Sequence, residues 1–127
     1  MAKQDQKASA AVGRAGEHLA LAYLSLAGYS CTLCQIKDHD AYIQTDTQTL
    51  TLQVKTASKT HKTTNSYAFH TPRKNAGVSD VFAFVSIDLG AVIFRRGDDI
   101  TSVTTYISKK EFLNEEQSMQ KTFDSFK

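Results

Sequence analysis

The segment Thr49 to Thr56 alternates between polar and apolar side chains, and this pattern limits the possible folds more than any other feature of the chain. Leu50, Leu52 and Val54 fall on one face of an extended segment, and Thr, Gln and Lys residues fall on the other. A period of two predicts a β-strand that is buried on one face. The chain therefore has to build a sheet and cover one side of it with another element.

The stretch from Ala10 to Ala27 is a candidate for that cover. Its apolar residues recur at the three- and four-residue intervals of one helix face, and Gly28 follows as the expected stop signal. Residues Met1 to Ser9 are polar and are expected to form a flexible N-terminus. Together the helix and strand patterns indicate an α/β or α+β domain.

Further strands and a final helix are predicted around this strand. Ser108 and Glu111 have the spacing of a capping box, which predicts a helix opened by Ser108, and the chain is expected to fray beyond about Gln117. With 127 residues, the chain predicts a single domain over residues 10–117 with a mixed central sheet, and a polar tail over 118–127. The other predicted strands are Tyr29 to Ile36, His39 to Gln44, Ser66 to Thr71, Val81 to Ile87, Ala91 to Arg95 and Val103 to Ile107, with a turn or short helix around Pro72 to Gly77.

The composition excludes a membrane span. No apolar run approaches the ~18 residues that crossing a bilayer requires, and the most apolar stretch is Leu19 to Ala27. Basic residues before that stretch leave a cleaved signal peptide, and so a secreted protein, as an alternative. Glu17 and His18 beside it favour the amphipathic helix. We therefore expect a cytoplasmic protein.

Two cysteines, Cys31 and Cys34, have the C-x-x-C spacing of redox sites and of half a zinc site. No second cysteine pair accompanies them. Their neighbours predict a strand, in which positions i and i+3 point to opposite faces. Two reduced thiols are therefore the simpler interpretation.

Asp40 faces Gln53 if the second and third predicted strands form a hairpin closed by Thr45 to Gln48. The two Cβ atoms then lie roughly 4.5–5.5 Å apart, and Lys55 points to the same face. A carboxylate, an amide oxygen and the Val54 carbonyl are hard oxygen ligands of the kind that Mg²⁺ accepts beside water and substrate phosphate. Lys55 would then activate a water molecule or stabilise transition-state charge. The ordinary alternatives are a cross-strand hydrogen bond and a solvated lysine.

Glu17 lies in the run Gly13-Arg14-Ala15-Gly16-Glu17. Glycine inside a helix costs about 0.5–1 kcal/mol relative to alanine. Two of them predict a place where the backbone comes close to something else, either an edge of the sheet or a phosphate backbone. Taken alone, Glu17 is most simply a solvent-facing helix residue.

In order along the chain, Gly-x-x-Gly-Glu, Asp40 and Gln53-Val54-Lys55 resemble the PD-(D/E)XK phosphodiesterase superfamily. The pattern is most similar to the branch that holds Holliday-junction resolvase-like proteins and the group I intron homing endonucleases of cyanobacteria, in which Gln replaces the last acidic residue. The resemblance covers Ala11 to Ala57 well. His39 stands where the family name has Pro, and Gln53 carries no charge.

This resemblance implies a restriction-endonuclease-like α-βββ-α-β core and cleavage of DNA phosphodiesters with Mg²⁺, for which Mn²⁺ would substitute. It implies that Asp40 binds the metal, that Gln53 replaces the second acid and that Lys55 is the catalytic lysine. It also places Glu17 near the metal, and it implies a homodimer, since paired cuts in a duplex need two sites.

Charge placement points to DNA as well. The net charge is only +2, but no acidic residue lies between Asp46 and Asp80. A loop of Thr, Ser, Asn and Lys in this region suits phosphate contact, and a flexible solubilising loop is the alternative. Tyr67 and Phe69 are expected to pack against the sheet and not to stack on bases. The predicted DNA-binding residues are Arg14, Lys59, Lys62, Arg73 and Lys74.

The sequence thus predicts a metal-dependent DNA endonuclease of the homing-endonuclease or junction-resolvase type, acting on duplex or branched DNA. Glu17, Asp40, Gln53 and Lys55 are its predicted catalytic residues, and Glu17, Asp40, Gln53 and the Val54 carbonyl its predicted metal ligands. Because Gln53 removes one negative charge from the metal site, the alternative is a catalytically inactive module that binds nucleic acid and retains the nuclease fold.

Overall fold

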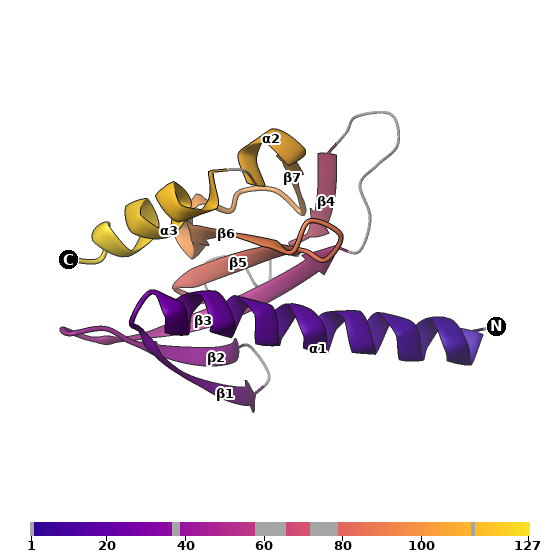
Figure 1. Cartoon of the computed structure of the whole chain (residues 1–127), viewed down its shortest axis with the longest axis horizontal. Coiled ribbons are helices and arrows are strands. Elements are labelled where there is room, and N and C mark those ends of the chain that lie inside the picture. The colour runs from indigo at the N-terminus through magenta and orange to yellow at the C-terminus, as the bar shows by residue number, and fades with distance from the viewer. Residues whose placement is uncertain (1, 37–38, 58–65, 72–78, 113) are drawn as a thin grey trace.

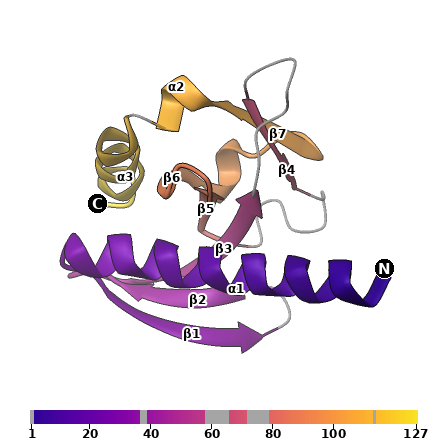
Figure 2. The same ribbon diagram turned by 45° about the vertical axis from the view of Figure 1, so that its right-hand side comes forward.

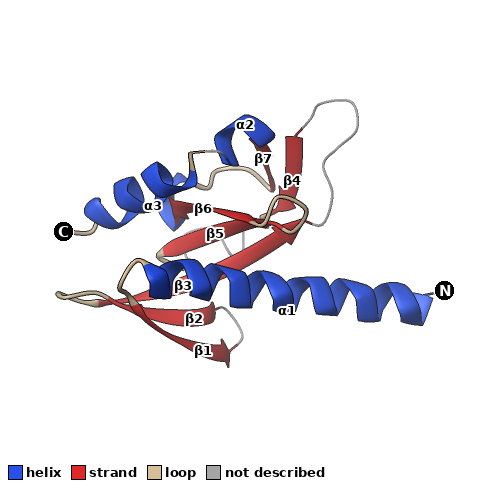
Figure 3. Cartoon of the chain, in the orientation of Figure 1, coloured by secondary structure: helices blue, strands red, loops and turns tan. Residues whose placement is uncertain are grey.

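The computed structural model describes residues 2–36, 39–57, 66–71, 79–112 and 114–127 (Figure 1). The helices are α1 (Ala2–Leu26), α2 (Lys109–Phe112) and α3 (Glu115–Asp124), with one 3₁₀ turn, η1 (Gly97–Asp99). The strands are β1 (Ser30–Ile36), β2 (His39–Gln44), β3 (Thr49–Ala57), β4 (Ser66–His70), β5 (Val81–Ser86), β6 (Ala91–Arg96) and β7 (Thr104–Ser108). α1 comes before all the strands and α2 and α3 come after them, as Figure 3 shows, so the protein has a mixed α+β fold.

A five-stranded sheet in the order β1-β2-β3-β5-β6 forms the centre, and β4 and β7 pair in a separate two-stranded sheet. β3 pairs parallel with β5, and the other pairs of the large sheet are antiparallel, so the sheet is mixed as predicted. Gln44 pairs with Thr49 and Ala41 with Leu52, which confirms the predicted hairpin register.

The large sheet is covered on both faces. Leu50, Leu52 and Val54 of β3 point toward α1 and form one core with Ala20 and Leu24 of that helix, as the alternating pattern predicts. The opposite face of β5 and β6 forms a second core under β4, β7 and α2, with six aromatic or large aliphatic residues at its centre: Tyr67, Phe69, Phe82, Phe84, Ile107 and Phe112. The view in Figure 2 shows α1 on one side and the β4–β7 pair on the other. Burial of Tyr67 and Phe69 confirms that they pack inward.

Both ends of the chain are more helical than the sequence pattern predicts. α1 begins at Ala2 and not near Ala10, because no Gly or Pro interrupts the good helix formers of residues 2–9. The predicted stop at Gly28 is confirmed by its φ of 97°. The tail expected to fray beyond Gln117 is instead the helix α3, held by Phe123, which is 3% exposed in the core.

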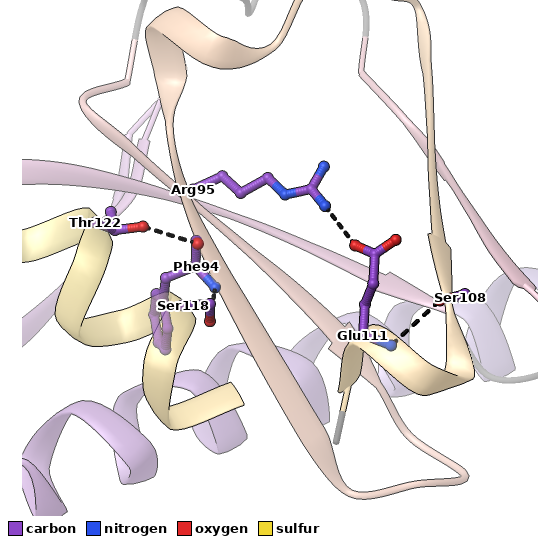
Figure 4. A network of polar contacts seen from close by, with 6 residues as sticks. All are labelled: Phe94, Arg95, Ser108, Glu111, Ser118 and Thr122. Atoms are coloured by element: carbon purple, nitrogen blue, oxygen red, sulfur yellow. Dashed lines mark hydrogen bonds and ion pairs between the residues drawn. The ribbon is translucent and has the colours of Figure 1, made fainter. Parts of the chain in front are cut away.

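α3 also closes one edge of the large sheet (Figure 4). The Ser118 hydroxyl accepts a hydrogen bond from the Phe94 N–H at 3.2 Å, and the Thr122 hydroxyl donates one to the Phe94 carbonyl at 2.8 Å. These side chains take the place of a neighbouring strand along the edge strand β6. Nearby, the Ser108 hydroxyl accepts from the Glu111 N–H, as the capping box predicts, and the Glu111 carboxylate pairs with Arg95 at 2.7 Å.

The turn or short helix expected around Pro72 to Gly77 falls outside the described residues. None of the helices that the structure describes is long and apolar enough to cross a membrane.

Candidate active site

Asp40 lies where the β2–β3 ladder ends. The backbone pairing stops at Ala41 and Leu52, and beyond it the Asp40 side chain takes over as partner of β3. Its Oδ2 atom accepts a hydrogen bond from the Val54 N–H at 2.7 Å and another from Gln53 Nε2 at 3.1 Å. The predicted contact between Asp40 and Gln53 is therefore present. The carboxylate is held at the point where the two strands part.

Glu17 reaches the same place from the helix. Its side chain hydrogen-bonds to that of Asp40, so two carboxyl groups from α1 and β2 meet at the end of the ladder. Burial, followed by the charge of Asp40 and this hydrogen bond, raises the pKa of Glu17 above its usual value. A carboxyl group binds a metal ion in its ionised form, so metal binding at this pair would compete with the proton of Glu17.

Gly16 is what allows Glu17 to come so close. A Cβ atom at Gly16 would lie 1.9 Å from Thr56 Oγ1 and 2.8 Å from Thr56 Cγ2, so any side chain at this position forces Thr56 or the helix to move. The backbone of α1 thus rests directly on β3 one residue before Glu17. The close approach predicted from the glycines is to the sheet. At Gly13, by contrast, a Cβ atom would have no neighbour within 4 Å among the described residues.

Lys55 and Gln53 share one face of β3. Both are half-buried and alternate with the buried Val54, and in the parallel pairing they lie beside Phe84 and Phe82 of β5. The Val54 N–H points to the β2 side, and in an extended strand the carbonyl of the same residue points to the same side. The Val54 carbonyl therefore lies on the edge of β3 that faces Asp40, as a metal ligand at this position requires.

The donor set suits a hard divalent cation. Glu17 and Asp40 supply two carboxylates, and Gln53 and Val54 supply neutral oxygens, which together with water and a phosphate oxygen are the ligands that Mg²⁺ prefers. Within the described ranges no group of three or more His, Cys, Asp or Glu side chains is placed to hold a metal ion.

Arg14 lies at the same site, one helical turn before Glu17. It is exposed, and its positive charge acts to lower the Glu17 pKa against the larger effects that raise it. Of the five predicted DNA-binding residues, Arg14 is the one whose place the structure describes. Lys59, Lys62, Arg73 and Lys74 lie outside the described residues.

Two contacts that the sequence analysis missed hold the strands around this site. Asp80, just before β5, accepts hydrogen bonds at its Oδ2 from the Thr51 N–H at 3.0 Å and the Thr51 hydroxyl at 3.1 Å. His39 Nδ1 lies 2.9 Å from the Ser79 hydroxyl. Both contacts join the start of β5 to the hairpin that carries Asp40. The available signal was the Ser79-Asp80 pair in front of the apolar run from Val81 to Val85.

The two cysteines take no part in the site. Both are free thiols. Burial raises the pKa of Cys31, which lowers the fraction of the reactive thiolate form at a given pH. This agrees with two reduced thiols.

Comparison with known proteins finds a solved structure with a similar fold. The chain resembles the solved structure of a bacterial homing endonuclease, with a TM-score of 0.67 over 89% of this chain and 95% of that chain, at 13% sequence identity. No protein-family model matches the chain, and neither does any curated protein. The likeness shows that the two proteins share a fold.

Proposed function

We propose that this protein is a divalent-metal-dependent DNA endonuclease of the PD-(D/E)XK type. The observation that carries the proposal is the contact between Glu17 and Asp40 at the end of the β2–β3 ladder, beside Gln53 and Lys55. Two carboxyl groups in contact are unfavourable when both are ionised, and such pairs are typical of sites that bind a cation. The shared fold with a bacterial homing endonuclease supports DNA as the substrate.

In this proposal, Asp40, Glu17, Gln53 and the Val54 carbonyl hold Mg²⁺, and Mn²⁺ substitutes for it. The bound ion would polarise the scissile phosphate and lower the pKa of a water molecule. For Gln53 to act as a ligand, its amide must turn so that its oxygen replaces the nitrogen that now faces Asp40.

Lys55 supplies a positive charge in addition to that of the metal ion. Its ammonium group is carried on the face of β3 that also holds Gln53, where it orients the attacking water and stabilises the extra negative charge on phosphorus. Arg14 lies one helical turn before Glu17, where its guanidinium group would bind a DNA phosphate next to the one that is cleaved. Because a duplex is cut on two strands, we expect two copies of the chain to act as a homodimer.

A second candidate function is an inactive DNA-binding module. Gln53 favours it, since its amide N–H now satisfies Asp40 without any metal. Such a module binds DNA with a steep salt dependence but gains no affinity from Mg²⁺.

Cleavage of three substrates separates these functions: a supercoiled plasmid, a linear duplex and a synthetic four-way junction, each with Mg²⁺, Mn²⁺ or EDTA. Metal-dependent cutting supports the nuclease, and a preference for the junction identifies a resolvase. DNA binding without cutting by the folded protein under all metal conditions supports the module.

A further inference from the structure

We propose that the β4–β7 pair is a DNA-reading ribbon whose outer face enters the major groove of B-form DNA. The proposal rests on the proposed function only for its substrate class, DNA. The ribbon stands over the C-terminal end of β3, and β3 is the strand that carries Gln53 and Lys55 (Figures 1 and 2).

One face of the ribbon is fixed to the protein. Tyr67 and Ile107 pair across the two strands and are fully buried, and Phe69 is 2% exposed. The Tyr67 ring meets Phe112 edge-on at 5.1 Å, and its hydroxyl donates a hydrogen bond to Asp88. The Thr71 hydroxyl ties the end of β4 to the Ser102 carbonyl, just before β7, and to the Thr105 hydroxyl in β7. The ribbon is therefore rigid before any partner binds, which lowers the entropy lost on binding.

The other face is polar around one exposed aromatic ring. Tyr106 is 65% exposed, and its cross-strand partner is Ala68, which is too small to cover the ring. His70 and Thr104 pair on one side of them, and Ser66 and Ser108 on the other. The His70 imidazole and the Thr104 hydroxyl are donors and acceptors for base edges and phosphates, whereas the Ser108 hydroxyl already accepts from the Glu111 N–H, and none of these six residues is acidic.

Charge on the flanking sequence favours DNA as the occupant of this face. Residues 47–79 and 100–110, which contribute the two strands, contain seven of the fifteen Lys and Arg residues of the chain and none of its thirteen acidic residues. Because the net charge of the whole chain is only +2, the excess of positive charge belongs to these two segments and not to the chain in general. It suits a polyanion and not an acidic or apolar protein surface.

The dimensions suit the major groove. A two-stranded ribbon fits a groove about 12 Å wide, and five residues per strand extend roughly 17 Å, about the rise of five base pairs. The deep, narrow major groove of A-form RNA does not admit it. The ribbon therefore predicts a preference for duplex DNA over duplex RNA.

The test measures binding of the full-length protein, in EDTA, to a labelled DNA duplex of about three helical turns and to an RNA duplex of the same sequence. Tyr106→Glu is compared with Leu26→Glu, which makes the same charge change at a side chain 87% exposed on the C-terminal end of α1. Both variants are expected to melt like the wild type, because both side chains are exposed.

We expect Tyr106→Glu to weaken DNA binding by about tenfold or more and Leu26→Glu to change it little. The major-groove ligand methyl green displaces the protein, and the minor-groove ligand netropsin does not. Equal losses in the two variants, displacement by netropsin alone, or equal affinity for RNA overturns the ribbon. If the protein binds DNA through the ribbon but does not cleave it, only the proposed nuclease activity is contradicted. If it cleaves DNA and Tyr106→Glu has no effect, only the proposed role of the ribbon is contradicted. If the wild type does not bind DNA, both proposals are contradicted.

Discussion

The side chains of Glu17 and Asp40 hydrogen-bond to each other although they come from α1 and β2, 23 positions apart in the chain. Burial, followed by this contact, raises the pKa of Glu17, and the contact marks the place where the helix, the hairpin and the third strand of the sheet meet. A divalent cation between them would relieve the repulsion between the two ionised carboxylates. The predictions below follow from this arrangement and from the packing that produces it.

Glu17→Gln should stabilise the metal-free protein at neutral pH. The folded state holds the Glu17 proton to a higher pH than the unfolded chain does, so stability falls as pH rises from the unfolded value of 4.5 through the folded pKa. Glutamine does not ionise, so the variant does not undergo this loss. Above the folded pKa of Glu17 we expect its free energy of unfolding to exceed that of the wild type by less than about 1 kcal/mol, and below pH 4.5 we expect no difference. Thermal unfolding in EDTA across this pH range measures the difference, and an equal gain at low pH contradicts the account.

The same variant should weaken Mg²⁺ binding. In the wild type, affinity for Mg²⁺ rises with pH through the raised pKa of Glu17, because the metal has to displace the proton. Glu17→Gln flattens this dependence. Calorimetric titration with MgCl₂ at several pH values tests it, and an unchanged pH dependence would place Glu17 outside the metal site.

Gly16→Ala should destabilise the protein by about 1–3 kcal/mol, since the new Cβ collides with Thr56 and pushes α1 away from β3. Thr56→Ala in the same chain removes the colliding atoms and should restore much of the loss. Gly13→Ala is the matched control. With no neighbour within 4 Å, it should stabilise the helix by about 0.5–1 kcal/mol. Urea unfolding gives all three values, and similar effects at Gly13 and Gly16 would refute the close approach.

Gln53→Glu should increase Mg²⁺ affinity by about tenfold, because it adds a charged ligand beside Asp40. Without metal it should lower the melting temperature, since its carboxylate faces Asp40 where an amide N–H now donates. Gln44→Glu makes the same change at an exposed position of β2 and should do neither. If the two variants behave alike in titration and melting, Gln53 is not a ligand position.

Thr122→Val should cost about 1–2 kcal/mol, because the buried hydroxyl that donates to the Phe94 carbonyl is lost. It should also promote association through the edge of β6. Gln120→Ala, on the exposed side of α3, should stay within about 0.5 kcal/mol of the wild type. Unfolding and light scattering test both effects, and a Thr122→Val protein with the stability and molecular mass of the wild type would show that α3 does not protect this edge.

Local patterns predicted the parts of the fold that depend on local physics. The alternation over Thr49 to Thr56 and the four-residue turn before it gave the β2–β3 register, and with it the meeting of Asp40 and Gln53. The glycine at position 16 predicted a close approach but not its partner Thr56, because a sequence pattern does not show which atoms a helix meets.

The missed features depend on distant residues. α3 is polar along most of its length, and its packing through Phe123 and its bonds to Phe94, both distant in the chain, help to hold it on the sheet. Pairing of β4 with β7 in a separate sheet joins segments almost 40 positions apart, and no local pattern specifies that pairing. The bonds from Asp80 to Thr51 and from His39 to Ser79 follow only once β5 lies beside β3.

The most direct test of the account is cleavage of supercoiled plasmid by the wild type, Asp40→Asn and Lys55→Ala, with Asp46→Asn as the control in the exposed turn between β2 and β3. We expect the wild type and Asp46→Asn to cut with Mg²⁺ and not with EDTA. Asp40→Asn and Lys55→Ala should be slower by about a hundredfold or more while still folded. Cutting that survives in Asp40→Asn, or that proceeds in EDTA, would contradict a metal-dependent nuclease site at the meeting of α1, β2 and β3.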